Sequence, residues 1–201
     1  VWMARSTDDG RTFARETSPY DTRVGTCGCC GTAALADRSG DVYVLFRSAA
    51  NLVHRDARLL VSRDAGTSFS ERRLQAWDIG ACPMSAFALA DAPDAVLAAW
   101  ETGGQVQWAR VDRRTNDVSA IVAAPREATD RKYPAVAENA AGETLFAWVE
   151  GASWNKGGAL AWQMYDREGH ATSEHGSAPG VPAFSFAAVL TRPDGSFAIV
   201  Y

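Results

Sequence analysis

This chain has 201 residues, of which 47% are hydrophobic and 22% charged, and its formal net charge is −4 at pH 7. An acidic balance argues against a nucleic-acid partner, because nucleic acids are bound through a basic surface. No stretch approaches the roughly 18 consecutive apolar residues of a membrane-spanning helix, so we expect no membrane span.

Four segments of the chain resemble one another and recur at intervals of about 50 residues. Each combines a strand of small residues, a turn rich in Asp, Gly or Asn, and a strand of β-branched or aromatic residues, which is typical of a β-hairpin. The sequence therefore predicts an all-β fold, a β-propeller of four-stranded antiparallel blades. The hairpins are expected at residues 32–46, 85–100, 134–148 and 186–200, and further strands at 58–62, 72–77, 106–111, 118–122 and 159–165.

Two turns repeat the motif Ser-x-Asp-x-Gly-x-(Thr/Ser)-Phe, at residues 6–13 and 62–69. The Asp carboxylate can accept backbone N–H groups inside the turn, the Gly supplies a positive φ, and the Phe is expected to pack under the hairpin. The motif resembles the Asp box of the sialidase-type (BNR-repeat) propellers, where its role is structural. The residues concerned are Ser6, Asp8, Gly10, Phe13, Ser62, Asp64, Gly66 and Phe69.

The resemblance implies a single propeller domain over residues 1–201. Residues 24–78, 80–124 and 131–178 are expected to form three blades, and residues 1–17 and 183–201 to share another, which would remove open sheet edges. Sialidase-type propellers usually have about six blades, so the chain either closes as a smaller propeller or belongs to a larger one. In the second case open edges would pair with another surface, such as a second copy of the chain. The strand-like first residues favour a longer protein.

The four cysteines lie just before the first strands of two neighbouring blades, with Cys27, Cys29 and Cys30 before one and Cys82 before the next. Two disulfides would fix these loops, and a bond from Cys82 to residues 27–30 would join the blades. Disulfides would point to a periplasmic or secreted protein. The alternatives are a metal site formed by the four cysteines, or by cysteines with His54, and free thiols.

In Asp-box propellers the Asp boxes lie on the face away from the ligand, so the resemblance places binding around the opposite mouth of the central channel. Carboxylates and arginines there would hydrogen-bond sugar hydroxyls, and aromatic rings would stack on sugars. The loops that we expect at this mouth contain three catalytic candidates, Glu101, Glu150 and Tyr133. The ligand-binding candidates are Arg47, His54, Arg131, Lys132, Trp154 and Asn155.

The resemblance also implies a chemistry. Sialidase-type enzymes hold the substrate carboxylate with three arginines and use a Tyr nucleophile, an assisting Glu and an Asp acid/base. Arg47, Arg131, Tyr133 and Glu101 or Glu150 are candidates for some of these parts. The chain lacks the Arg-Ile-Pro motif that marks the first arginine in sialidases.

Two functions follow as alternatives. One is a sialidase-like glycoside hydrolase, and the other is a non-catalytic propeller that binds a glycan or a protein. The ligand would be a carbohydrate or another small molecule at the channel mouth, with no cofactor apart from a metal at the cysteines. A carboxylate pair about 5–10 Å apart would favour hydrolysis, whereas glutamates that diverge would favour binding.

Overall fold

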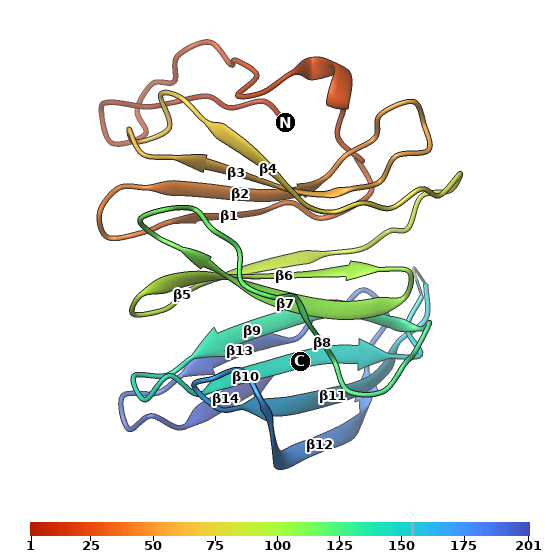
Figure 1. Ribbon diagram of the computed structural model, residues 1–201. Coiled ribbons are helices and arrows are strands. Elements are labelled where there is room, and N and C mark those ends of the chain that lie inside the picture. Colours follow the sequence, from red (N-terminus) through yellow and green to blue (C-terminus); the bar gives the residue numbers. More distant parts are fainter. Residues whose placement is uncertain (154) are drawn as a thin grey trace.

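The computed structural model describes residues 1–153 and 155–201, and nearly all its regular elements are antiparallel strands (Figure 1). The first sheet contains β1 (Ala33–Ala36), β2 (Val42–Arg47), β3 (Ala57–Ser62) and β4 (Ser70–Gln75). The second contains β5 (Phe87–Asp91), β6 (Ala95–Thr102), β7 (Gln105–Asp112) and β8 (Val122–Ala123). The third contains β9 (Arg131–Glu138), β10 (Thr144–Glu150), β11 (Gly158–Tyr165) and β12 (Ala171–Val181), and β13 (Ala188–Thr191) pairs with β14 (Phe197–Val200).

The three four-stranded sheets follow one another in chain order with their faces together, as Figure 1 shows. Within this stack the first strands of successive sheets are neighbours, because β1 lies against β5, β5 against β9 and β9 against β13. These inner strands are rich in alanine, which allows close approach at the crowded centre. The arrangement is the predicted β-propeller of four-stranded antiparallel blades. In the described part of the chain, no helix is long and apolar enough to cross a membrane.

The hydrophobic core lies between neighbouring sheets, and β6 shows how one strand serves two of its layers. Val96, Ala98 and Trp100 pack towards the first sheet, whereas Leu97 and Ala99 pack towards the third. Alternate side chains of a strand point to opposite faces, so a sheet between two others is apolar on both faces. This explains why β6 is buried over most of its length.

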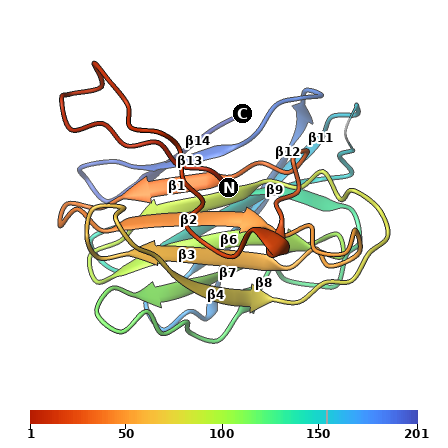
Figure 2. The same ribbon diagram turned by 90° about the horizontal axis from the view of Figure 1, so that it is seen from above.

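Each sheet has two ends, and the loops gather at them (Figure 2). Because successive strands are antiparallel, the segment before the first strand and the loop between the second and third strands share one end, here called the cysteine end. A Cys29–Cys82 disulfide and a hydrogen bond of 2.8 Å from Lys132 Nζ to the Pro83 carbonyl connect the first three sheets at this end. The turn at residues 62–69 joins β3 to β4 and therefore lies at the opposite end.

The two Asp turns share one hydrogen-bond pattern. Asp8 Oδ1 accepts from the Thr12 backbone N–H at 2.9 Å, and Asp64 Oδ1 accepts from that of Ser68 at 2.8 Å. Hydrogen bonds from Thr12 and Ser6 lower the pKa of Asp8 to about 2. Ser6 Oγ and Ser62 Oγ each accept from the Gly four residues later, and both glycines have positive φ. Phe69 packs against the first sheet, whereas Phe13 is 64% exposed and does not cover its turn.

The two chain ends lie against different sheets. Val1 and Tyr20 pack on Val44, Phe46 and Leu60 of the first sheet, and Met3 forms a β-bridge with Thr17. The β13–β14 pair packs against β9 instead and overlaps the third sheet in the view of Figure 1. The blade boundaries expected from the sequence, the blade shared by residues 1–17 and 183–201, and self-association through open edges stay predictions.

Candidate functional site

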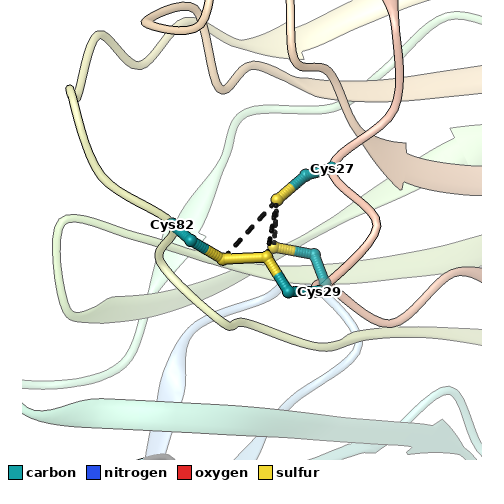
Figure 3. Close-up of side chains that lie close together, drawn as sticks. Cys27, Cys29 and Cys82 are labelled. Atoms are coloured by element: carbon teal, nitrogen blue, oxygen red, sulfur yellow. Dashed lines mark hydrogen bonds between the residues drawn. A yellow bond between two sulfur atoms is a disulfide. The ribbon is translucent and has the colours of Figure 1, made fainter.

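The four cysteines meet at the cysteine end of the first two sheets (Figure 3). Cys29 and Cys82 form a disulfide, which supplies the predicted link between the two blades. The second predicted disulfide is not present, because Cys27 and Cys30 are buried free thiols whose sulfurs lie 3.3 Å apart. Burial raises the pKa of the Cys30 thiol, which donates a hydrogen bond to Cys27 Sγ.

Arg47, at the end of β2, is buried beside these cysteines. Its guanidinium donates to Ser85 Oγ at 3.1 Å and to the carbonyls of Arg55 and Glu101. Burial lowers its pKa, and negative charge on Glu101, Cys30 and Cys27 acts in the opposite direction. With only 1% of its surface exposed, Arg47 connects loops of two sheets and is not available to a ligand in this structure.

Arg131 and Glu150 come together at the same end of the third sheet. Arg131 Nε lies 3.0 Å from Glu150 Oε1, and the same oxygen accepts the indole N–H of Trp148 at 3.0 Å. The guanidinium carbon lies 5.1 Å from the Trp148 ring centroid, in cation–π geometry. Arg131 is buried, whereas the Glu150 side chain is 36% exposed. Glu150 is therefore held in place with one edge open to solvent.

Glu101 and Tyr133 form a second candidate pair. Glu101 is buried, its Oε1 accepts the Gly104 N–H at 2.6 Å, and its buried Oε2 has no hydrogen-bond partner. Tyr133 occupies a β-bulge of β9 with a φ of 56°, a strained value for a residue with a Cβ. Burial, and secondarily the charge of Glu101, raises the pKa of the Tyr133 phenol.

The cavity beside Tyr133 is apolar. It has a volume of about 260 Å³ and lies between β5, β9 and β13. Phe186 contacts the Tyr133 ring edge-on, with 4.8 Å between ring centroids, and half of the remaining lining residues are alanines. Neither glutamate lines this cavity among its described residues, so the structure does not gather the predicted polar residues into one channel mouth.

The other predicted residues are dispersed. His54 Nδ1 lies 2.6 Å from Asp78 Oδ1 at the surface and is not in the cysteine cluster. The Lys132 ammonium binds a backbone carbonyl, and Asn155 is exposed in a turn where it accepts from Ser153 Oγ at 3.4 Å. Trp154 lies outside the described residues.

A groove on the third sheet was not predicted. It has a volume of about 560 Å³, and it is bounded by β10–β12 on one side and by residues 125–126 on the other. Its polar and aromatic lining residues are Arg126, Trp148, Glu150, Trp162, Gln163, His175 and Ser177. Of the catalytic and ligand-binding candidates named above, only Glu150 lines this groove. The two tryptophans and His175 were missed, because a Trp within a strand is usually a core residue and the strand containing His175 carries little pattern.

Trp162 is placed in this groove by Gly176, its partner in the β11–β12 ladder. A Cβ built on Gly176 would lie 2.8 Å from Trp162 Cζ2, so only glycine lets the indole lie against the backbone of β12. The half-buried Trp162 therefore forms a fixed apolar surface in the same groove as the Glu150 carboxylate.

No family model matches the sequence, and no curated protein matches it. Solved structures do match. An alpha-L-arabinanase of Penicillium chrysogenum, complexed with arabinobiose, has 12% identity and a TM-score of 0.65 over 99% of this chain and 66% of the other. An alpha-L-arabinofuranosidase of Fusarium graminearum, also with arabinobiose, has 12% identity and a TM-score of 0.63 over the same shares.

A sialidase from Streptococcus pneumoniae has 14% identity and a TM-score of 0.60 over 98% of this chain and 32% of its own. This chain thus spans just under two thirds of the two arabinan-type proteins and about one third of the sialidase. At these identities the likeness shows that the propeller fold is shared, and nothing about the site.

Proposed function

We propose that this chain is a carbohydrate-binding propeller of the Asp-box (BNR-repeat) type, and that it binds a glycan in the groove on its third sheet. The groove carries the proposal because it combines an indole surface at Trp162 with a fixed carboxylate at Glu150. Sugar sites are built in this way, since an aromatic ring packs on the apolar face of a sugar and polar groups form hydrogen bonds with its hydroxyls.

Two observations support this proposal. The fold is shared with proteins whose names describe them as arabinanase, arabinofuranosidase and sialidase, and two of those structures hold arabinobiose. The two Asp turns share the hydrogen bonds expected of Asp boxes.

A disulfide is consistent with an exported protein, and we propose a periplasmic or secreted location.

Binding without cleavage is the version that the groove favours. Hydrolysis of a glycosidic bond usually requires two carboxyl groups, one of which is a proton donor. Among the described residues that line the groove, Glu150 carries the only carboxylate. One of its oxygens already accepts hydrogen bonds from Arg131 and Trp148. The groove can therefore hold a sugar, but the described residues that line it offer no second acid.

Glycoside hydrolysis is the second candidate, and it would use Tyr133 and Glu101. The strained φ of Tyr133 and the unpartnered Oε2 of Glu101 favour it, because strain and orphaned polar atoms often mark functional sites. The raised pKa of Tyr133 opposes it, since a neutral phenol is a poor nucleophile.

The test is a glycan array that includes arabinobiose and 3′-sialyllactose, followed by calorimetry on each glycan that binds. We expect Trp162→Ala to weaken binding at least roughly tenfold, because it removes the large indole surface on which the apolar face of the sugar packs. Trp2→Ala is the matched control, since Trp2 is 66% exposed and is not a groove residue. Binding that survives in Trp162→Ala, or no binding on the whole array, would contradict the proposal. Release of sugar by the wild-type protein would favour the second candidate.

A further inference from the structure

The cysteine cluster has the dimensions of a metal site. All four sulfurs lie within 4.8 Å of one another, and Cys27 Sγ is 3.3 Å from Cys29 Sγ, 3.3 Å from Cys30 Sγ and 3.8 Å from Cys82 Sγ (Figure 3). In a tetrahedral zinc site with Zn–S bonds of about 2.3 Å, the sulfurs are about 3.8 Å apart. The three distances from Cys27 differ from that value by no more than about half an ångström.

The surroundings of the cluster are suited to negative charge. The Arg47 guanidinium is buried, and its hydrogen bonds go to neutral acceptors, two carbonyls and Ser85 Oγ. Among the ion pairs of the described residues, none includes Arg47. The guanidinium is nevertheless close enough to interact with charge on Cys27 and Cys30. Glu101 is the largest negative charge acting on this buried guanidinium, followed by Cys30 and Cys27, so thiolates at these two positions would add to the counter-charge of a cation that is costly to bury.

Ser85 links the cation to the sulfurs directly. Its Oγ accepts from Arg47 Nε at 3.1 Å and donates to Cys30 Sγ at 3.9 Å. Hydrogen bonds of this kind orient sulfur ligands and are common around thiolate-bound metals. The loops before β1 and β5 also bring their cysteines together from two sheets, so one ion could connect the same blades that the disulfide connects.

We propose that reduction of the Cys29–Cys82 disulfide converts this cluster into a four-cysteine site for Zn²⁺. One molecule of a dithiol reductant such as dithiothreitol would break the S–S bond by thiol–disulfide exchange, giving the thiols of Cys29 and Cys82 and the cyclic disulfide of the reductant. The ion then binds four thiolates and releases four protons, and the resulting charge of −2 is partly balanced by Arg47. Oxidation removes two of the four ligands, so the disulfide and the metal exclude each other.

The test is metal binding by the reduced and the oxidised protein. The chain is reduced with dithiothreitol, freed of it by anaerobic gel filtration, and titrated with Co²⁺ and then with Zn²⁺. We expect one ion per chain in the reduced protein, with the sulfur-to-cobalt charge-transfer bands of a tetrahedral thiolate site that Zn²⁺ abolishes, and no such bands in the oxidised protein. Equal zinc binding by both forms, or a cobalt spectrum without thiolate bands, would overturn the proposal.

Two cysteine variants separate ligand loss from misfolding. Cys27→Ser and Cys82→Ser should each lower the zinc affinity of the reduced protein at least roughly tenfold, because each removes one thiolate. Cys27 is buried and Cys82 is exposed, so the second substitution is tolerated even if the first disturbs packing, which circular dichroism would reveal. His54→Ala should leave the affinity unchanged, since His54 pairs with Asp78 outside the cluster. Unchanged affinity in Cys82→Ser would overturn the proposal.

Discussion

Arg131 and Glu150 are partners in the β9–β10 ladder, and their side chains also form an ion pair, with Arg131 Nε 3.0 Å from Glu150 Oε1. The backbone register therefore fixes which carboxylate reaches the buried guanidinium. Trp148 strengthens the pair by donating to the same oxygen and by lying under the guanidinium. The pair lies at the cysteine end of the third sheet and places the Glu150 carboxylate in the groove.

Glu150→Gln should destabilise the protein, because it leaves the buried Arg131 without its counter-charge. We expect a loss of about 2 kcal/mol in the free energy of unfolding, less than for a fully buried pair because Glu150 is partly exposed. Urea unfolding followed by tryptophan fluorescence measures it. Glu168→Gln, at an exposed turn position, is the control and should change stability by less than about 0.5 kcal/mol. An equal change in both variants would show that the ion pair contributes no stability.

The parts of this fold that depend on short-range spacing could be predicted from the sequence. The hairpins follow from alternation and turn residues, and residues 58–62 and 72–77 correspond closely to β3 and β4. The last strand of the third sheet, β12, was poorly marked because most of its residues are exposed, so it carries little hydrophobic alternation. The turn at residues 62–69 was recognisable because its hydrogen bonds join residues at most four apart.

The candidate site depended on packing between sheets, which no local pattern records. Arg47 was expected at a channel mouth, but the second sheet covers it and supplies the carbonyl of Glu101 as its acceptor. The place of Trp162 in the groove could not be predicted from the sequence, because it depends on Gly176 in the neighbouring strand. The cysteine cluster was predicted because four cysteines before two consecutive first strands must meet if those strands are neighbours. Two disulfides were expected there, and the structure has one of them, the link between the blades, with Cys27 and Cys30 as free thiols.

The carboxyl of Asp8 should titrate with a pKa of about 2, because the hydrogen bonds that it accepts within the turn favour its ionised form. Its folded-state pKa is below the usual value near 3.9, so its stabilising contribution is complete above about pH 4 and is lost as the pH falls towards 2. Carbon-detected NMR of the side chain measures the midpoint. Thr12→Val removes the hydroxyl bond but keeps the backbone N–H, and it should raise the pKa of Asp8. The same midpoint in both proteins would contradict this account of the turn.

Gly176→Ala should disturb the groove. A Cβ at this position would lie 2.8 Å from Trp162 Cζ2 and 3.0 Å from Cε2, so the indole must move. We expect a loss of about 1–3 kcal/mol in unfolding free energy, as for other overpacking substitutions, together with a shift in the Trp162 indole N–H resonance. Gly80→Ala is the matched control, because open space surrounds Gly80 and its φ is not positive. Equal effects of the two substitutions would mean that Gly176 does not place Trp162.

Glu101→Gln tests whether Tyr133 and Glu101 act on each other. Burial is the larger reason for the raised pKa of Tyr133, and the charge of Glu101 adds to it. Removing that charge should therefore lower the pKa of Tyr133 while leaving it above the ordinary value. NMR titration of proteins carrying ¹³C-labelled tyrosine, with Tyr133→Phe for assignment, measures the change.

Tyr43 is the internal control for this experiment. Burial also raises its pKa, but the charges that act on it belong to Arg63, Asp37 and Asp41. Its titration should therefore be the same in Glu101→Gln and in the wild type. A selective fall at Tyr133 would establish the pair and show that the phenol remains protonated at neutral pH, which suits hydrogen bonding to a ligand better than nucleophilic attack. A pKa of Tyr133 that does not move would remove the electrostatic basis for a Tyr–Glu catalytic pair in this chain.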